Sequence, residues 1–377
     1  MRRLFHLRSL QDLVDLPDGG GHVSARALAS AGRVPLPTLP TGQHSLPMWD
    51  VPIGPSGAHW TEDYYDSVAP ILIEFHDVLV HGAAGIVMAG DHLISNTLHQ
   101  VHGPRDGFAL LAEQMVHVDL ADVPVRVRGR HLSLLTGNEA NYYHWMMDGI
   151  GRLAALPGGE ILACDGVLHP EFTMGFQNDS FRRLDLRLPA RAVPRGATIW
   201  VERMLIPWSV LGDHRPHPSI VPLFQRLAGT PAEAPGLYPQ RLYIDRRGSA
   251  NRGLRNEDEV VAALARLGFV IIKLENFELS AQIALFANAE IVVAPHGAGL
   301  TNLLFAGSQT RVVELLMDTW VNWCFRRLAA LRRIYYDCVI GREDRPHGAP
   351  ASDWPHDKTW TISVPQVLVA VEQALAG

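Results

Sequence analysis

The second half of the chain alternates strand-like and helix-like hydrophobic patterns. Short runs of Val, Ile and Leu predict strands, and apolar residues recur with helical spacing between them. The predicted order is strand 241–246, helix 256–268, buried strand 269–274, helix 280–289, strand 290–295, helix 299–307, strand 311–316 and a last helix 365–376. Asn256 and Ser280 are expected as N-caps, and Gly268 is expected to end its helix. The alternation predicts βαβ units with a parallel sheet.

The first half has a different pattern. Residues 1–60 are rich in Pro and Gly and predict an extended arm. Short β-prone runs at 71–82, 85–95, 115–120 and 127–136 predict meandering strands, and a helix 140–156, a strand 160–169, a helix 172–186 and a strand 197–207 follow. Residues 227–240 carry three prolines and two glycines, and they are expected to link an N-terminal domain, 1–226, to a C-terminal domain, 241–377.

Composition narrows the class of protein. The chain has 377 residues, of which 47% are hydrophobic and 19% charged, and its formal net charge is −6. Because there is no basic excess, a nucleic-acid partner is not expected. The three cysteines form no CxxC pair. Polar residues interrupt the N-terminal apolar run before it reaches the length of a signal-peptide core, and no later run has the length of a membrane span. We therefore expect a cytoplasmic protein without a transmembrane segment.

A glycine-containing turn follows the predicted strand 290–295. The sequence APHGAGLTN, 294–302, places two glycines where a helix begins, and a helix N-terminus at the carboxyl end of a parallel strand binds anions such as diphosphates. The glycines either let backbone N–H groups approach the ligand or serve packing alone. The candidate residues of this turn are His296, Gly297, Ala298, Gly299, Thr301 and Asn302.

Two further features converge on the same sheet edge. Arg246 and Arg247 follow the strand at 241–246, and the planar guanidinium suits bidentate phosphate contacts. The alternative is that both arginines are simply solvated. Glu314 lies in the strand 311–316, where a carboxylate can accept hydrogen bonds from ribose hydroxyls or emerge into solvent.

The helix 140–156 carries a continuous polar stripe opposite its apolar face. The stripe contains Asn141, His144, Asp148 and Arg152. His144 and Asp148 are four residues apart, so the carboxylate can orient the imidazole, and either residue can then remove a proton from an attacking hydroxyl. The alternative is a solvent-exposed stripe with an Asp148–Arg152 ion pair, although Trp145 beside it disfavours full exposure.

Several motifs are absent from the sequence. There is no HExxH, GxSxG, Walker A or GxGxxG motif, which disfavours zinc proteolysis, serine hydrolysis, P-loop chemistry and simple dinucleotide redox. No Asp-x-Asp motif is present either. We therefore expect no cofactor and no bound metal, and phosphate neutralisation by arginines and a helix dipole.

Four segments together resemble glycosyltransferase family 61, including its bacterial members associated with capsular and other surface polysaccharides. They are NYYHWMMDGIGRL, RLYIDRRG, NEDEVVAALARLGF and the long segment from Leu279 to Leu315 that contains HGAGLTN. The resemblance covers about 134–316. It departs from the family at Asp245, where a small hydroxyl residue is usual, and at Gly151, where proline is common. Asp245 either weakens phosphate binding or buttresses an arginine.

The resemblance implies an α/β fold of the GT-B type, with two Rossmann-like lobes facing a cleft, here with a β-rich N-terminal extension. It implies inverting transfer of a sugar from a nucleotide diphosphate, expected to be UDP, to a saccharide or lipid-linked acceptor. The donor is expected on Arg246, Arg247, Glu314 and the 296–302 turn. Asp148 is the first candidate for the base and His144 the second, with Asn141 and Trp145 on the acceptor side.

Other functions remain compatible with these residues. A catalytically silent nucleotide-sugar or glycan-binding module has the same fold requirements. A phosphotransferase or an epimerase would use the same nucleotide sugar. Contact with a membrane surface is also compatible with a lipid-linked acceptor.

Overall fold

The computed structural model divides the chain into two compact units. Unit 1 comprises Met1–Gly32 and Val68–Gly212, and unit 2 comprises Arg33–Ser67 and Asp213–Gly377. The structure describes residues 2–8, 22–39, 63–98, 108–111, 115–119, 124–208, 215–229, 237–345 and 357–376. This division differs from the predicted one in two ways: it falls before 227–240, and unit 2 takes a segment of the N-terminal region. Most of the predicted linker, 230–236, lies outside the described residues.

Unit 2 is built on a parallel sheet. Its strands are β14 (Arg241–Ile244), β15 (Gly253–Leu254), β16 (Val270–Ile272), β17 (Ile291–Pro295), β18 (Arg311–Met317), β19 (Tyr335–Glu343) and β20 (Thr359–Thr361). The order across the sheet is β15-β20-β19-β18-β17-β14-β16, and β16, β14, β17, β18 and β19 run parallel. If these five strands are numbered by their order along the chain, they lie side by side in the order 2-1-3-4-5. The order reverses between β14 and β17, and open α/β sheets bind ligands at such a switch point.

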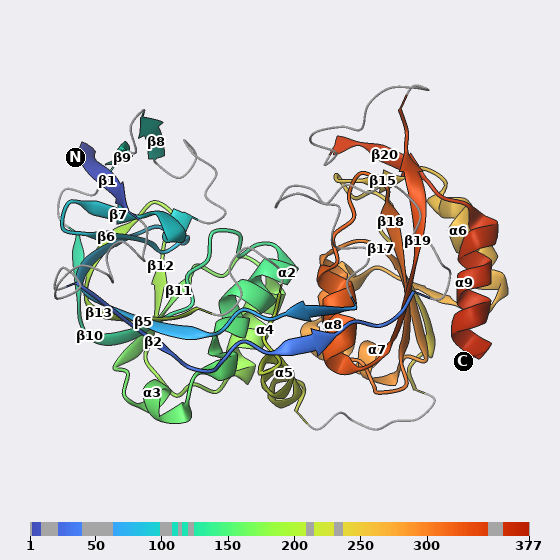
Figure 1. The fold of residues 1–377 in the computed structure, drawn as a ribbon, viewed down its shortest axis with the longest axis horizontal. Helices are drawn as coiled ribbons and strands as arrows, with labels where there is room; N and C mark the ends of the chain where they lie inside the picture. The colour runs from blue at the N-terminus through green and yellow to red at the C-terminus, as the bar shows by residue number, and fades with distance from the viewer. Residues whose placement is uncertain are drawn as a thin grey trace. The chain divides into compact units, whose positions relative to one another are not determined.

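Helices cover both faces of this sheet (Figure 1). They are α5 (Ile220–Ala228), α6 (Glu257–Arg266), η7 (Leu274–Asn276), α7 (Leu279–Asn288), η8 (Ala298–Phe305), α8 (Cys324–Arg332) and α9 (Val364–Ala376). α6 and α9 contact each other over one face, and α7 and α8 both contact η8 on the other. Alternate strand residues such as Val293 and Val313 pack with Val260 and Val367 into one apolar core.

Unit 1 contains a larger mixed sheet. Its strands are β1 (Arg2–Arg8), β2 (Val23–Ala27), β5 (Ile71–His81), β6 (Ile86–Ala89), β7 (His92–Ile94), β8 (Phe108–Leu111), β9 (Met115–Asp119), β10 (Val125–Ser133), β11 (Gly166–Pro170), β12 (Ala190–Val193) and β13 (Thr198–Trp208). β12, β11, β10 and β13 are parallel, and β13 then pairs antiparallel with β5. The unit therefore joins a parallel, Rossmann-like part to an antiparallel meander.

Helical segments connect the parallel strands of unit 1. They are α2 (Tyr142–His144), η5 (Trp145–Gly149), η6 (Ile150–Ala155), α3 (Gly158–Leu162) and α4 (Gly175–Arg183), with η3 (Ser95–Leu98) in the meander. α2, η5 and η6 form one continuous helical stretch that begins as α-helix, widens to a π-turn and ends as a 3-10 helix. π-turns of this kind occur often at functional sites.

A short hairpin from the N-terminal region completes unit 2. β3 (Arg33–Pro35) pairs antiparallel with β4 (Tyr64–Asp66). Val34 and Tyr65 pack against Leu331 of α8, and the Tyr65 hydroxyl donates to the Pro216 carbonyl at 2.9 Å. Residues distant in sequence are thereby joined into one core.

Most predicted elements are present, with local differences. The helix 256–268 begins at Glu257, and Gly268 adopts a left-handed φ of +81° after its last turn, as expected for a C-terminal glycine. Three expectations were wrong. Ser280 lies inside α7 and does not cap it, and the first three residues of the expected strand 160–169 belong to α3. Among the described strands, β14 alone pairs with β16, so β16 is an edge strand and its Val270 is 43% exposed.

Within the described part of the chain, no helix combines the length and apolar character needed to cross a membrane.

Tyr65→Ala tests the attachment of the β3–β4 hairpin. Tyr65 is 2% exposed, and Tyr64 on the same strand is 42% exposed. Removing the buried ring should lower the free energy of unfolding by about 3 kcal/mol, measured by urea denaturation. Tyr64→Ala is the matched control and should cost less than about 1 kcal/mol. Equal losses in the two variants would mean that the hairpin core contributes nothing specific.

Candidate anion-binding and acid–base sites

Two loops of unit 2 meet at the switch point of the parallel sheet. One follows β14 and carries Arg246, and the other follows β17 and carries the turn from His296 to Gly299. The guanidinium of Arg246 donates through Nη1 to the His296 carbonyl and through Nη2 to Ser249 Oγ at 2.9 Å. Burial lowers the pKa of Arg246. The two segments that were predicted to lie at one edge of the sheet are therefore in contact.

The two glycines of this turn have separate roles. A Cβ at Gly297 would lie 2.5 Å from Nη1 of Arg246, so the absence of a side chain makes room for the guanidinium. A Cβ at Gly299 would lie 2.6 Å from Cδ1 of Leu274. Both glycines therefore admit protein side chains, and Gly299 fits the packing alternative. Ala298 begins η8 directly after Gly297.

Asp245 and Arg247 form an ion pair beside Arg246. The Arg247 guanidinium lies 2.7 Å from Asp245 Oδ2 and 2.8 Å from Asp258 Oδ1. Burial raises the pKa of Asp245, but its hydrogen bonds from Arg247 outweigh this and hold the pKa below its usual value. Asp245, where the sequence departs from the family pattern, therefore buttresses Arg247. The charge of Arg247 is already paired with two carboxylates, those of Asp245 and Asp258. Arg246 is the better candidate for an anion.

Glu257 is a site residue that the sequence reasoning missed. It is 3% exposed, and its Oε1 accepts hydrogen bonds from the Arg246 backbone N–H at 2.9 Å and from the Tyr243 hydroxyl at 3.0 Å. Burial raises the pKa of Glu257. In the sequence this residue has the ordinary appearance of an acid in the first turn of a helix. Its contacts instead make it the support of the Arg246 backbone.

His296 is held by a buried carboxylate. Its Nδ1 lies 2.5 Å from Glu314 Oε1, and the Tyr336 hydroxyl donates to Glu314 Oε2 at 2.5 Å. Glu314 is fully buried, so the alternative that it emerges into solvent is wrong. Both of its oxygens already accept hydrogen bonds within the protein, and the expected contact with ribose hydroxyls stays a prediction. Burial lowers the pKa of His296 despite the carboxylate. Glu314 therefore orients the imidazole.

Thr301 and Asn302 lie inside unit 2. Both are 0% exposed, and Asn302 Nδ2 donates to Gln282 Oε1 at 2.9 Å. The Asn302 side chain holds η8 against α7, and neither side chain presents a donor at the surface. The expectation that these two side chains add ligand contacts therefore does not match their positions.

Arg252 is the second residue that the sequence reasoning missed. It lies in the loop between β14 and β15, with its guanidinium over the Trp320 ring at 4.7 Å from the centroid. Burial and the nearby charge of Arg246 lower the pKa of Arg252 to about 10. The loop sequence has no periodicity, so no sequence signal distinguishes this arginine from Arg255.

Unit 1 brings His144 and Asp148 together on its helical stretch. His144 Nδ1 lies 2.7 Å from Asp148 Oδ2, and the two side chains are 16% and 4% exposed. The stripe is therefore not solvated, and the exposed alternative is wrong. With Nδ1–H donating to the carboxylate, Nε2 is the basic nitrogen of the imidazole. The more exposed member of the pair is His144.

Other residues of the same stretch hold it in place. Trp145 is fully buried, and its indole Nε1 donates to Ser180 Oγ of α4 at 2.8 Å. It is therefore a core residue here and not a surface for an acceptor. Asn141 caps the first turn by accepting from the Tyr143 N–H at 2.9 Å. Arg152 is buried and donates to the Leu135 carbonyl at 2.8 Å.

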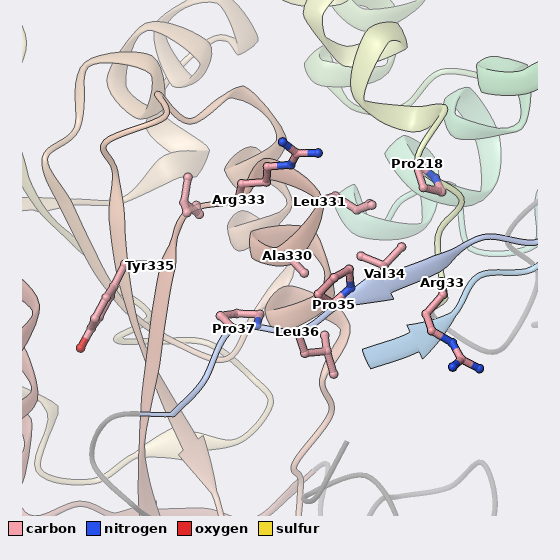
Figure 2. Close-up of a pocket in the computed structure, with 11 residues that line it drawn as sticks. Arg33, Val34, Pro35, Leu36, Pro37, Pro218, Ala330, Leu331, Arg333 and Tyr335 are labelled. Carbon is pink, nitrogen blue, oxygen red and sulfur yellow. The ribbon is translucent and has the colours of Figure 1, made fainter. Parts of the chain in front are cut away.

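Unit 2 also contains a cavity of about 630 Å³ beside the β3–β4 hairpin (Figure 2). It is lined by Val34–Pro37 of the hairpin segment, by Pro218, and by residues at the end of α8 and the start of β19, among them Leu331 and Arg333. Its lining includes none of the residues that surround Arg246 and His296. The cavity and the anion-binding turn are thus separate features of the unit.

A comparison with family models finds one match. Residues 142–313 match the model of Glycosyltransferase 61. This region holds His144 and Asp148 in unit 1, and Arg246, Arg252 and His296 in unit 2. The match supports the family to which the sequence motifs pointed, and with it glycosyl transfer as the general activity.

Curated relatives are similar over shorter stretches. The beta-1,2-xylosyltransferase XAX1 of Oryza sativa subsp. japonica is 38% identical over 92 residues, 24% of this chain and 16% of that protein. The EGF domain-specific O-linked N-acetylglucosamine transferases of Gallus gallus and Rattus norvegicus are 34% and 27% identical over 141 and 144 residues. The matched part spans 26% and 27% of their lengths. These relatives come from a plant and from animals, and they do not support the bacterial surface-polysaccharide type.

Gly297→Ala tests whether the turn serves Arg246. Because the new Cβ would displace the partly buried Arg246 guanidinium, the affinity for UDP should fall about tenfold by calorimetry, with little change in stability. Gly299→Ala should show the reverse, with a loss of about 1 to 3 kcal/mol in unfolding free energy from overpacking against Leu274. Gly158→Ala, where no heavy atom lies within 4 Å of the added Cβ, is the control. Unchanged UDP affinity in Gly297→Ala would contradict the assignment.

Proposed function

We propose that this protein is an inverting glycosyltransferase that transfers a sugar from a nucleoside diphosphate to a hydroxyl of a saccharide or glycolipid. The observation that carries the proposal is Arg246 on the His296–Gly297 turn, at the switch point of a parallel 2-1-3-4-5 sheet. This is where an open α/β sheet binds an anionic ligand. The family match over 142–313 supplies the reaction class.

The donor half of the proposal rests on the charges of unit 2. Arg246 is partly buried, its backbone N–H donates to Glu257, and its guanidinium contacts the His296 carbonyl just before η8. A guanidinium with two parallel N–H groups suits a phosphate, and its field stabilises negative charge that develops on a leaving diphosphate. We propose a uridine nucleotide as donor and a GT-B type of fold, with the donor bound by the C-terminal lobe.

The acid–base half rests on His144 and Asp148 of unit 1. We propose His144 as the base and Asp148 as the residue that positions it. The sequence analysis ranked the two candidates for the base in the opposite order, with Asp148 first. Asp148 is almost completely buried, and its Oδ2 is occupied by the His144 Nδ1–H. Burying the carboxylate limits its own access to a hydroxyl, whereas the imidazole presents a basic Nε2.

The proposed reaction is a single displacement. The acceptor oxygen attacks the anomeric carbon, the bond from that carbon to the diphosphate oxygen breaks, and the hydroxyl proton moves to His144 Nε2. The electron pair of the broken bond leaves on the diphosphate, where Arg246 stabilises it. Inversion at the anomeric carbon follows because one displacement takes place.

The acceptor class is also a proposal. The printed names of the relatives describe transfer of xylose in one protein and of N-acetylglucosamine in the others. For this chain we propose a saccharide or lipid-linked saccharide acceptor, with synthesis of a surface polysaccharide as the process. Acceptor arrays with oligosaccharides and EGF-domain peptides would separate this class from a protein acceptor.

A panel of nucleotide sugars tests the donor assignment. At a ligand concentration of 100 times Kd, binding should stabilise the protein by about 2.7 kcal/mol, which thermal unfolding detects readily. UDP-sugars are expected to respond, and Arg246→Ala should remove most of the response. No response to any UDP-, GDP-, ADP- or CMP-sugar would refute the proposal. Binding without transfer to any acceptor would instead favour a catalytically silent module.

His144→Ala and Asp148→Asn test the base. His144→Ala should lower the transfer rate about 10²- to 10⁴-fold and leave UDP affinity unchanged, because the two groups lie in different units. Asp148→Asn should also reduce the rate, because a neutral amide holds the His144 Nδ1–H less firmly than the carboxylate does. His76→Ala, a half-exposed histidine of β5, is the control. If Asp148→Asn were inactive and His144→Ala fully active, Asp148 would be the base.

A further inference from the structure

The cavity of about 630 Å³ in unit 2 lies between the β3–β4 hairpin and the end of α8 (Figure 2). Sites for small molecules usually have volumes of about 300 to 1,000 Å³ and a mostly apolar lining. Most of the lining here is apolar, and it consists of Val34, Pro35, Leu36, Pro37, Pro218, Ala330, Leu331 and Ile334. Tyr335 also lines the cavity, but Figure 2 shows its ring directed away from the other lining residues. The cavity therefore suits a ligand with an apolar body.

The two walls of the cavity are fixed to each other. Val34 and Leu36 belong to a buried cluster of the hairpin segment that packs against Leu331 of α8. In addition, the Arg326 guanidinium of α8 donates through Nη2 to the Pro37 carbonyl at 2.7 Å. A cavity whose walls are already in place requires little ordering of the protein when a ligand binds.

Two arginines line the cavity, and their charges are compensated differently. Arg33 Nε donates to Asp66 Oδ1 at 3.0 Å, and the Arg33 guanidinium lies over the Tyr64 ring. Arg333 is exposed, and no acidic side chain in the described part of the chain forms an ion pair with it. The charge that the cavity offers to a ligand is therefore that of Arg333.

The backbone of Arg333 has a conformation that is unusual for its residue type. Arg333 follows the last turn of α8 with a φ of +56° and a ψ of +39°, where glycine or asparagine is the usual residue. The next residue, Ile334, is buried, and its N–H donates to the Ala329 carbonyl at 3.1 Å, which holds this turn in place. Figure 2 shows the Arg333 side chain extending from the end of α8 toward Leu331. A backbone outlier of this kind is a reason to look for a ligand.

We propose that the cavity binds a single-chain fatty carboxylate, with its chain among Val34, Leu36 and Leu331 and its carboxylate on Arg333. One guanidinium matches one negative charge, and its parallel N–H groups suit the two oxygens of a carboxylate. Burial of the aliphatic chain supplies most of the affinity. The cavity shares no lining residue with the turn that follows β17, so this inference goes beyond the proposed function and does not depend on it.

Decanoate and 1-decanol, which have the same chain, test the two parts of the ligand. Titration calorimetry below the critical micelle concentration should show one decanoate bound per chain. The affinity for 1-decanol should be about 10- to 100-fold lower, the range for a lost hydrogen bond to a charged group, and acetate should not bind. Equal affinities for decanoate and 1-decanol, or several decanoate molecules per chain, would overturn the proposal.

Arg333→Gly tests the cation without disturbing the fold. Glycine favours the left-handed backbone of this position, so the variant should unfold at a temperature no lower than that of the wild type. Its affinity for decanoate should fall about 10- to 100-fold, whereas its affinity for 1-decanol should not change. Unchanged affinity for decanoate in this variant would overturn the role of Arg333.

Two further variants control for charge and for the location of the ligand. Arg266→Ala removes an exposed arginine from the last turn of α6, outside the cavity, and should leave the affinity for decanoate unchanged. Ala330→Phe should fill part of the cavity and weaken the binding of both decanoate and 1-decanol. Equal losses in Arg333→Gly and Arg266→Ala would mean that decanoate responds only to net charge, and full binding in Ala330→Phe would place it elsewhere; either result overturns the proposal.

Discussion

The hydrogen bond from Arg246 to the His296 carbonyl ties together the two loops on which the unit 2 site depends. The loops come from β14 and β17, which are neighbours in space because the parallel sheet reverses its order between them. The contact needs the space left by Gly297, and the buried Glu257 carboxylate accepts from the Arg246 backbone N–H beside it. On the same turn, Glu314 holds the His296 imidazole. Each of these residues therefore has one main physical role at the junction of the two loops.

In each unit a buried carboxylate holds a histidine by its Nδ1. In unit 1 the Nδ1 of His144 meets the buried carboxylate of Asp148, and in unit 2 the Nδ1 of His296 meets the buried Glu314. A carboxylate at Nδ1 selects one tautomer and makes Nε2 the basic nitrogen. The difference lies in the access to the ring. His144 is the more exposed of the two, whereas His296 packs against Phe325 and lies beside two arginines that disfavour its protonation.

Two arginines of unit 2, Arg246 and Arg252, carry their charges at positions where burial disfavours the charged form. Arg246 and Arg252 are partly buried and repel each other, while Arg247 close by is paired with Asp245 and Asp258. The contrast between Arg247, which two carboxylates pair, and Arg246, whose guanidinium burial desolvates, distinguishes a structural ion pair from a candidate ligand site.

Local periodicity in the sequence determined much of this structure. The strand–helix alternation of residues 241–316, the glycine turn after β17, Arg246 and the i,i+4 pair of His144 and Asp148 all follow from spacings of a few residues, which secondary structure converts directly into position. Tertiary structure alone decided the rest. Arg252, Glu257 and the burial of Glu314 depend on partners from other segments, and the Arg326 guanidinium donates to the Pro37 carbonyl across 289 positions of the chain. No local pattern encodes such contacts, because they arise only when the sheet order brings distant loops to one edge.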